Sequence, residues 1–421
     1  MDELFGRLFA FDHLRDVPAG IKRVTLSRTI RWFGWGLGES LIPIFLLTFS
    51  TSFTEAGMLK SIYDAIFLIA LPIVSMFADM LTSRMLLIIA LIVYPFIGLS
   101  YFVAGLTGMV FFIIFARGLN GVAWCVDTIG VDTYVRRTAG PHSAAAAFGY
   151  VESIANLGWL AAAVIGFFMV QYVPVHILLF MIVPTSLLAL WPLWHLKDGN
   201  PHSTRAAHVF HSYQAFFSNV RTWHAGQRRV AWISFFLSVL SSMSTFFLPI
   251  AAYERGASLQ EVVLMTILFS IPALGAWSIA NVVDQIHKRP LLIALLSIMP
   301  LMFLGVALVP TYAVEVVAAF AIQVVVVSVD LIMQSYITVI SPREQYGSVT
   351  GAMDGIKEFG IMVTPVIAGA FADMSGLQGM FGAMFFVSII TALYAYRYPI
   401  SHRKPEEMVM PVAIPLDAEL E

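Results

Sequence analysis

Two stretches of the sequence repeat one pattern: GYVESIANLG at residues 149–158 and GAMDGIKEFG at residues 351–360. Each copy has a glycine at both ends and an acidic residue at its fourth position, and each opens a long apolar segment. A tyrosine precedes each copy at the same distance, as Tyr134 and Tyr336. An internal repeat over such a distance indicates that the chain is built from two related halves.

The composition indicates that most of the folded surface contacts lipid. Of the 421 residues, 59% are hydrophobic and only 12% are charged, and the mean hydropathy is +0.83. Soluble proteins carry about 25% charged residues. An apolar run of about 20 residues crosses a bilayer, and it does so as a helix because an open strand leaves its backbone groups unpaired in lipid. We predict twelve such helices, at 28–50, 56–78, 85–105, 108–133, 144–171, 175–195, 229–253, 259–283, 290–310, 313–340, 345–371 and 377–397.

The distribution of lysine and arginine predicts how the chain is oriented. If the N-terminus is cytoplasmic, the inner loops and tails carry nearly all the basic residues outside the spans, whereas the outer loops carry only Arg255. We therefore expect an inner (plasma) membrane protein with both termini in the cytoplasm. The expected organisation is a cytoplasmic segment 1–27, a six-helix bundle 28–195, a cytoplasmic linker 196–228, a second six-helix bundle 229–397 and a cytoplasmic tail 398–421.

Two short turns at the inner ends of helices carry the same charge pattern. Asp79 and Arg84 follow the second expected span, and Asp284, Lys288 and Arg289 follow the eighth. An aspartate in such a turn can face the positive N-terminal end of a neighbouring helix. The charged positions resemble the Gly-X-X-X-Asp-Arg-X-Gly-Arg-Arg motif of the major facilitator superfamily, although the glycines of that motif are replaced in both turns. In the family, the aspartate latches one half to the other in the outward-facing state.

The fourth span carries a second resemblance to that family. Arg117-Gly-Leu-Asn120-Gly121 is similar to the family pattern Arg-X-X-Gln-Gly, in which the arginine is linked to proton coupling. The resemblance implies two pseudo-symmetric six-helix bundles and transport by alternating access. It also implies that spans 1, 4, 7 and 10 line the cavity while spans 2, 5, 8 and 11 form the seam. Family exporters carry Gly-Pro in span five, where Gly158 here has no following proline, and this weakens an antiport interpretation.

Ionisable groups inside spans are the best candidates for the site, because they are costly in lipid. For proton coupling we select Glu39, which lies near mid-membrane with no opposite charge within one turn of its helix, together with Arg117 and Glu152. Arg117 lies about 13 Å inside its span at the rise of a helix. Burial favours the protonated form of a lone carboxyl group, so Glu39 is a candidate proton carrier.

Further charged and aromatic residues are expected around a substrate cavity. Lys60 and Asp64 share one helical face and can neutralise each other. In span eleven one lysine stands between two acids, which leaves either an excess carboxylate or a partner for Glu152. Asp127 and Asp330 can serve as inner gates, as proton exit groups or as a solvated vestibule. The residues proposed to surround the cavity are Trp35, Asp64, Asp127, Asp330, Asp354, Lys357 and Glu358.

The sequence favours a secondary transporter over the other classes considered. The leading hypothesis is proton-coupled export of a small organic compound, with a cation favoured because buried acids outnumber buried bases. The runner-up is proton-coupled uptake of a sugar, organic acid or other nutrient, and a non-transporting membrane sensor or scaffold is the alternative of another class. No enzyme motif, cofactor motif or metal-ligand spacing stands out. The expected partners are a small molecule, protons and the lipid bilayer, without nucleic acid, and the expected state is a monomer.

Overall fold

The computed structural model describes residues 17–139, 144–197, 223–276, 279, 283, 286–340, 346–398 and 400, without the side chains of 76, 78, 79, 144–146, 338, 339, 346–348 and 350. Helices fill the described chain. They are α2 (Ala19–Gly36), η2 (Glu39–Leu41), α3 (Ile42–Leu47), α4 (Phe53–Met80), α5 (Ser83–Thr107), α6 (Val110–Thr138), α7 (Ala144–Met169), α8 (Val175–Phe180), α9 (Ile182–Trp194), α11 (Ala225–Glu254), α12 (Leu259–Leu274), α14 (Lys288–Leu308), α15 (Tyr312–Ile340) and α16 (Tyr346–Arg397).

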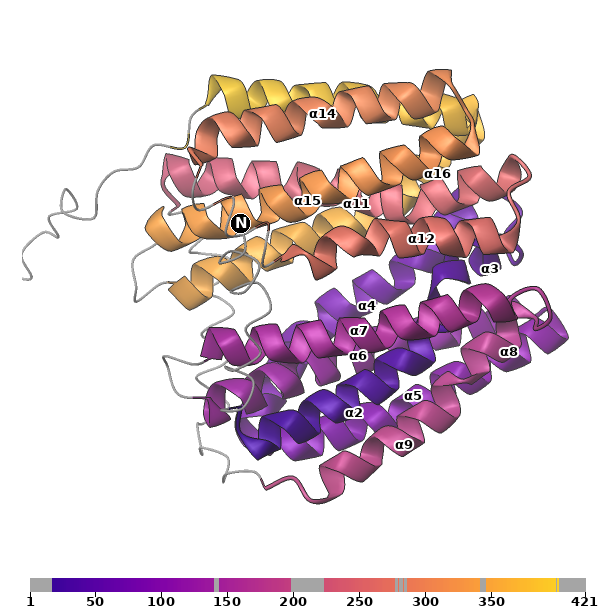
Figure 1. The fold of residues 1–421 in the computed structure, drawn as a ribbon, viewed down its shortest axis with the longest axis vertical. Coiled ribbons are helices and arrows are strands. Elements are labelled where there is room, and N and C mark those ends of the chain that lie inside the picture. The colour runs from indigo at the N-terminus through magenta and orange to yellow at the C-terminus, as the bar shows by residue number, and fades with distance from the viewer. Residues whose placement is uncertain are drawn as a thin grey trace, which may run out of the picture.

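The helices form two groups that stack against each other. Helices α2–α9 make the first half and α11–α16 the second, and the helices of both halves run roughly parallel (Figure 1). Within the first half α2 packs on α7 and α9, and within the second half α11 packs on α15 and α16. The internal repeat therefore corresponds to two helical bundles, and the all-helical membrane fold predicted from the sequence is confirmed.

The number of spans that satisfy a simple length and hydropathy criterion is lower than twelve. Nine helices in the described part of the chain are long and apolar enough to cross a membrane. Three features account for the difference. The charged α2 lacks the required hydropathy, α12 has only 16 residues, and α16 joins two helices across Gly376, whose positive φ of 74° breaks the helix. The count of twelve remains a prediction.

The first helix differs from its expected extent at both ends. α2 begins at Ala19, directly after Pro18, although the apolar run was expected to begin at residue 28. A helix can extend beyond the apolar core because lysine and arginine side chains near its end reach the membrane surface. The helix ends at Gly36, and a short 3₁₀ turn, Glu39–Leu41, leads into α3 with Pro43 in its first turn. The expected single span is therefore broken at Glu39.

The glycine that ends each copy of the repeat has a packing role. A Cβ atom on Gly158 of α7 would lie 2.5 Å from Thr29 Cγ2 of α2, and one on Gly360 of α16 would lie 3.2 Å from the carbonyl oxygen of Phe235 of α11. The glycine at the end of each repeat thus allows a close helix crossing in its own half. The glycines that open the two repeats, Gly149 and Gly351, have open space around them and do not serve this purpose.

The two halves are joined tightly at one end, which we call the closed end. Helix α4 of the first half crosses α16 of the second half there, and α7 contacts α12. A Cβ atom on Gly57 would lie 2.1 Å from the carbonyl oxygen of Pro365, and one on Gly369 would lie 2.4 Å from that of Phe53. Gln260 of α12 also donates to the carbonyl oxygen of Phe167. The expected seam of spans 2, 5, 8 and 11 is thereby confirmed.

Candidate functional site

A cavity of about 530 Å³ lies between the two halves. Residues of both halves form its wall, and the first half supplies most of the charged ones. The polar and aromatic residues of this wall are Trp32, Trp35, Glu39, Ser40, Lys60, Tyr63, Asp64, Arg117, Asn120, Trp124, Asn156 and Trp159 from the first half, and Ser244, Thr245, Phe246, Thr266, Phe269, Ser270, Gln323 and Glu358 from the second.

Glu39 lies at the break in the first span, and the break exposes its carboxylate to the cavity. Trp159 of α7 donates its Nε1–H to Glu39 Oε2 at 2.7 Å. The backbone of Gly36 makes this approach possible, because a Cβ atom there would lie 2.4 Å from the carbonyl oxygen of Trp159. No lysine or arginine in the described part of the chain forms an ion pair with Glu39. Its carboxylate is therefore held in place by a neutral donor.

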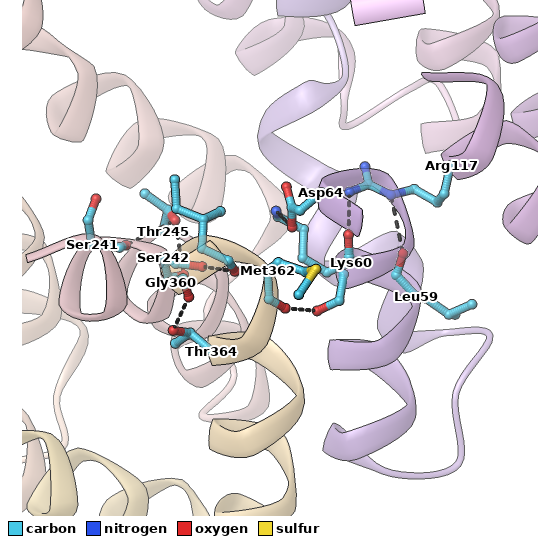
Figure 2. Close-up of polar contacts among 12 residues, drawn as sticks. Leu59, Lys60, Asp64, Arg117, Ser241, Ser242, Thr245, Gly360, Met362 and Thr364 are labelled. Carbon is cyan, nitrogen blue, oxygen red and sulfur yellow. Dashed lines mark hydrogen bonds and ion pairs between the residues drawn. The ribbon is translucent and has the colours of Figure 1, made fainter. Parts of the chain in front are cut away.

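Lys60 and Asp64 form the ion pair that their spacing predicted, with 2.6 Å between Nζ and Oδ2. Arg117 of α6 is only 3% exposed and lies beside this pair. Its Nε and Nη2 donate to the carbonyl oxygens of Leu59 and Lys60 at 3.3 and 2.9 Å (Figure 2). Its guanidinium lies 4.8 Å from the ring centroid of Tyr63. Arg117 thus ties α6 to α4 through backbone carbonyls, and the described residues provide no carboxylate that pairs with it.

The charged cluster of span eleven divides into two parts. Lys357 contacts Asp330 of α15 at 2.5 Å and Asp354 at 3.8 Å, and all three side chains lie outside the cavity wall. Glu358 alone lines the cavity. Of the two possibilities left open by the sequence, an excess carboxylate is the one observed, and it is Glu358. Lys357 does not pair with Glu152.

Two arginines of α2 were missed from the sequence, and they account for two of the predicted acids. Arg31 is fully buried and pairs with Asp127 at 2.6 Å. Arg28 pairs with Glu152 at 2.8 Å, where the side chain of Glu152 is 46% exposed. Asp127 and Glu152 consequently lie outside the cavity wall. The missed signal was the spacing of Arg28, Arg31 and Trp35, which places them on one helical face.

Aromatic side chains line the first-half wall, and several polar atoms there have no partner. Trp32 and Trp124 lie 5.8 Å apart between ring centroids, and Trp35 packs edge-on against Tyr94. Among the described residues, the buried Nε1 atoms of Trp32 and Trp35 have no hydrogen-bond acceptor, and the buried Oδ1 of Asn120 has no donor. Buried polar groups are normally paired, so these wall residues have hydrogen-bonding capacity that the described protein does not use.

The second-half wall is more apolar. Hydroxyl groups of α11 form hydrogen bonds mainly within the protein: Ser242 donates to the carbonyl oxygen of Ile361 at 3.1 Å, and Thr245 donates to that of Ser241 at 3.1 Å (Figure 2). Thr245 also lines the cavity, together with Phe246 and Phe269. Packing is therefore the main role of these hydroxyls.

The two charged turns that resemble the family motif are described only in part. The side chain of Asp79 and the whole of Asp284 lie outside the described residues. Arg84 donates to the carbonyl oxygen of Trp194 at 3.0 Å, Lys288 donates to Ser335 Oγ, and Arg289 donates to the carbonyl oxygen of Tyr396 at 3.5 Å. Each of these contacts stays within one half. The described residues also contain no group of three or more potential metal ligands.

Comparison with known proteins places this arrangement in a family. The sequence matches the Major Facilitator Superfamily model over residues 24–353 and 230–409. No curated protein sequence matches the chain.

Solved structures share the fold at low sequence identity. The nucleoside transporter NupG is 12% identical, with a TM-score of 0.72 over 90% of this chain and 99% of that one. The D-xylose–proton symporter is 16% identical, with a TM-score of 0.68 over 91% and 99%. The human organic anion transporter MFSD10 is 14% identical, with a TM-score of 0.64 over 90% and 99%. With a family model that covers most of its length and the fold of these transporters, the chain belongs to the Major Facilitator Superfamily.

Proposed function

We propose that this protein exports a small organic solute in exchange for protons, by alternating access of the cavity between its halves. The observation that carries the proposal is Glu39, a carboxylate that opens into the cavity, accepts a hydrogen bond from Trp159 and has no ion-pair partner among the described residues. A carboxyl group in such a place can bind a proton when the cavity faces one side and release it when the cavity faces the other.

The way in which the two halves meet supports a mechanism of alternating access. The crossing of α4 and α16 seals the closed end, and residues of both helices also line the cavity between the halves. The distribution of basic residues predicts that both termini are cytoplasmic, and in that orientation the closed end is the outer end, because α4 begins there. Rocking of one half against the other would open that seal and expose the cavity to the outside.

Charge balance in the cavity supports exchange. When ionised, Glu39, Asp64 and Glu358 carry three negative charges, and Lys60 and Arg117 carry two positive ones. One unit of negative charge in a site of low dielectric requires a compensating cation. A proton and a monovalent organic cation can each supply it, but both together would leave an excess of positive charge. The cavity would therefore hold either the proton or the organic cation at one time, and exchange transport requires this alternation.

A second function, proton-coupled uptake of a neutral polar nutrient, is favoured by one specific observation. Four residues of the cavity wall carry a buried polar atom that has no hydrogen-bond partner in the described structure: Trp32 Nε1, Trp35 Nε1, Asn120 Oδ1 and Gln323 Oε1. Donors and acceptors of this kind suit a hydroxyl-rich molecule. In that case the proton and the solute would occupy the cavity together and move in the same direction.

The two functions are distinguished by the direction of proton movement. The purified chain is reconstituted in liposomes that contain a pH-sensitive dye, and a panel of amines, sugars and organic acids is added outside. Exchange predicts that an added solute enters as protons leave, so the interior becomes more alkaline; cotransport predicts the opposite sign. A folded protein that gives no solute-dependent proton flux with any class contradicts both and favours a sensor or scaffold.

A further inference from the structure

The charges on the cavity wall are distributed unequally between the halves. The first half contributes Glu39, Asp64, Lys60 and Arg117, which amount to two acids and two bases. The second half contributes a single ionisable side chain, Glu358. The first-half wall is therefore balanced by itself, and the excess negative charge of the cavity belongs to Glu358.

The lysine next to Glu358 in the chain and the lysine of the cavity wall both have ion-pair partners already. Lys357 pairs with Asp330 at 2.5 Å, and Lys60 pairs with Asp64 at 2.6 Å. Neither lysine makes an ion pair with Glu358 in the described structure. A carboxylate that is costly to bury and that forms no ion pair with a described lysine or arginine is a candidate binding group for a cation from outside the protein.

The position of Glu358 is fixed by the backbone that follows it. The carbonyl oxygen of Ile361 accepts from Ser242 of α11, and the carbonyl oxygen of Met362 accepts from Ser61 of α4 at 2.6 Å. Gly360 packs closely against Phe235 of α11. Hydrogen bonds from both halves thus hold this turn of α16 (Figure 2). A carboxylate on a fixed turn gives a defined place for a charged group.

We propose that Glu358 binds the positively charged group of the substrate, and that the substrate is an organic amine with one positive charge and an apolar body. This inference rests on the proposed function and assigns different tasks to the two unpaired carboxyl groups. Glu39 takes the proton, and Glu358 selects the charge of the solute.

The remaining wall suits the body of such a molecule. Phe246, Met265 and Phe269 of the second half and Trp35 and Trp124 of the first half surround the cavity. Aromatic faces attract ammonium groups and also pack against apolar bodies. The side-chain oxygens of the wall residues Asn120 and Gln323 have no donor in the described structure, and after a side-chain rotation towards the cavity they can accept N–H groups of a protonated amine. The cavity volume of about 530 Å³ is in the usual range for sites of small organic ligands.

Binding to the detergent-solubilised full chain tests this assignment without requiring transport. The tryptophans of the wall report occupancy through their fluorescence. The probes are 2-phenylethylamine and 4-phenylbutylamine, which are protonated at pH 7, each compared with the alcohol of the same skeleton. We expect both amines to bind about tenfold or more tightly than their alcohols, as for a hydrogen bond between charged groups. We expect Glu358→Gln to reduce this ratio to about one, while Glu254→Gln, an exposed glutamate outside the cavity, keeps it.

Several results would overturn the assignment. They are equal binding of amine and alcohol to the unchanged protein, a preference for amines that persists in Glu358→Gln, and failure of both amines to bind a protein whose thermal unfolding is normal. The liposome experiment separates this failure from that of the proposed function. Proton-linked flux of a neutral or anionic solute without amine preference refutes only the role of Glu358, whereas amine binding without proton flux refutes only the proton coupling.

Discussion

Asp373 of the second half caps the helix that begins at Phe53 and Thr54 of the first half. Its Oδ2 accepts the backbone N–H of Thr54 at 3.0 Å and the Thr54 hydroxyl at 2.5 Å, and its Oδ1 accepts the backbone N–H of Phe53 at 2.8 Å. A carboxylate at a helix N-terminus satisfies unpaired N–H groups and the positive end of the helix dipole. This cap joins the two halves at the closed end, so it stabilises the closed end only while the halves are together.

Removal of the cap should shift the molecule towards a conformation that is open at this end. Loss of an N-cap costs about 1 kcal/mol, which corresponds to a population change of roughly fivefold. We expect Asp373→Ala to increase the population of long distances between spin labels at Tyr172 and Leu308, two exposed positions in different halves, in a Cys125→Ser background. An unchanged distance distribution would show that the cap does not hold the halves together. Glu254→Ala serves as the control.

Replacement of a glycine by alanine should change thermal stability differently at the helix crossing of the closed end and at an open position. Alanine favours a helix over glycine by about 1 kcal/mol. Gly149→Ala, which has open space around its Cβ position, should leave thermal stability unchanged or raise it. Gly57→Ala should lower it, because the added Cβ would lie 2.1 Å from the carbonyl oxygen of Pro365. Thermal unfolding of both variants in detergent measures this, and equal behaviour of the two contradicts a close crossing.

Loss of one member of the buried pair of Arg31 and Asp127 should destabilise the protein more than loss of both. Arg31→Met leaves the carboxylate of Asp127 buried without compensation, which costs about 3–5 kcal/mol. The double variant Arg31→Met/Asp127→Leu removes both charges and should recover most of that loss. A thermodynamic cycle over the two single variants and the double variant gives the coupling energy. Additive effects would mean that the two side chains do not stabilise each other.

The plan of the fold followed from the sequence because its strongest signals are local. Apolar runs of the length of a bilayer and a repeated glycine pattern are visible without any knowledge of contacts. The ends of the helices were harder to place. α2 starts nine residues earlier than the apolar run because charged residues continue the helix towards the membrane surface, and Gly376 breaks α16 only through its backbone conformation.

The ion pairs around the candidate site were predicted only where both partners lie on one helix. Lys60 and Asp64 are four residues apart, and their pairing follows from that spacing. The pairs of Arg31 with Asp127, of Arg28 with Glu152 and of Lys357 with Asp330 join different helices. Which acids remain unpaired therefore depends on how the helices pack. For this reason Asp127, Asp330 and Asp354 were expected at the cavity, while Glu358 could not be singled out.

The most direct test of the proposed function separates solute movement from proton movement in one variant. Liposomes with unchanged protein, Glu39→Gln or Glu254→Gln are assayed for exchange of labelled solute against unlabelled solute, and for accumulation driven by a pH gradient. We predict that Glu39→Gln keeps solute exchange and loses the response to the gradient, whereas Glu254→Gln keeps both. Accumulation that still follows the pH gradient in Glu39→Gln would contradict the assignment of Glu39 as the proton carrier.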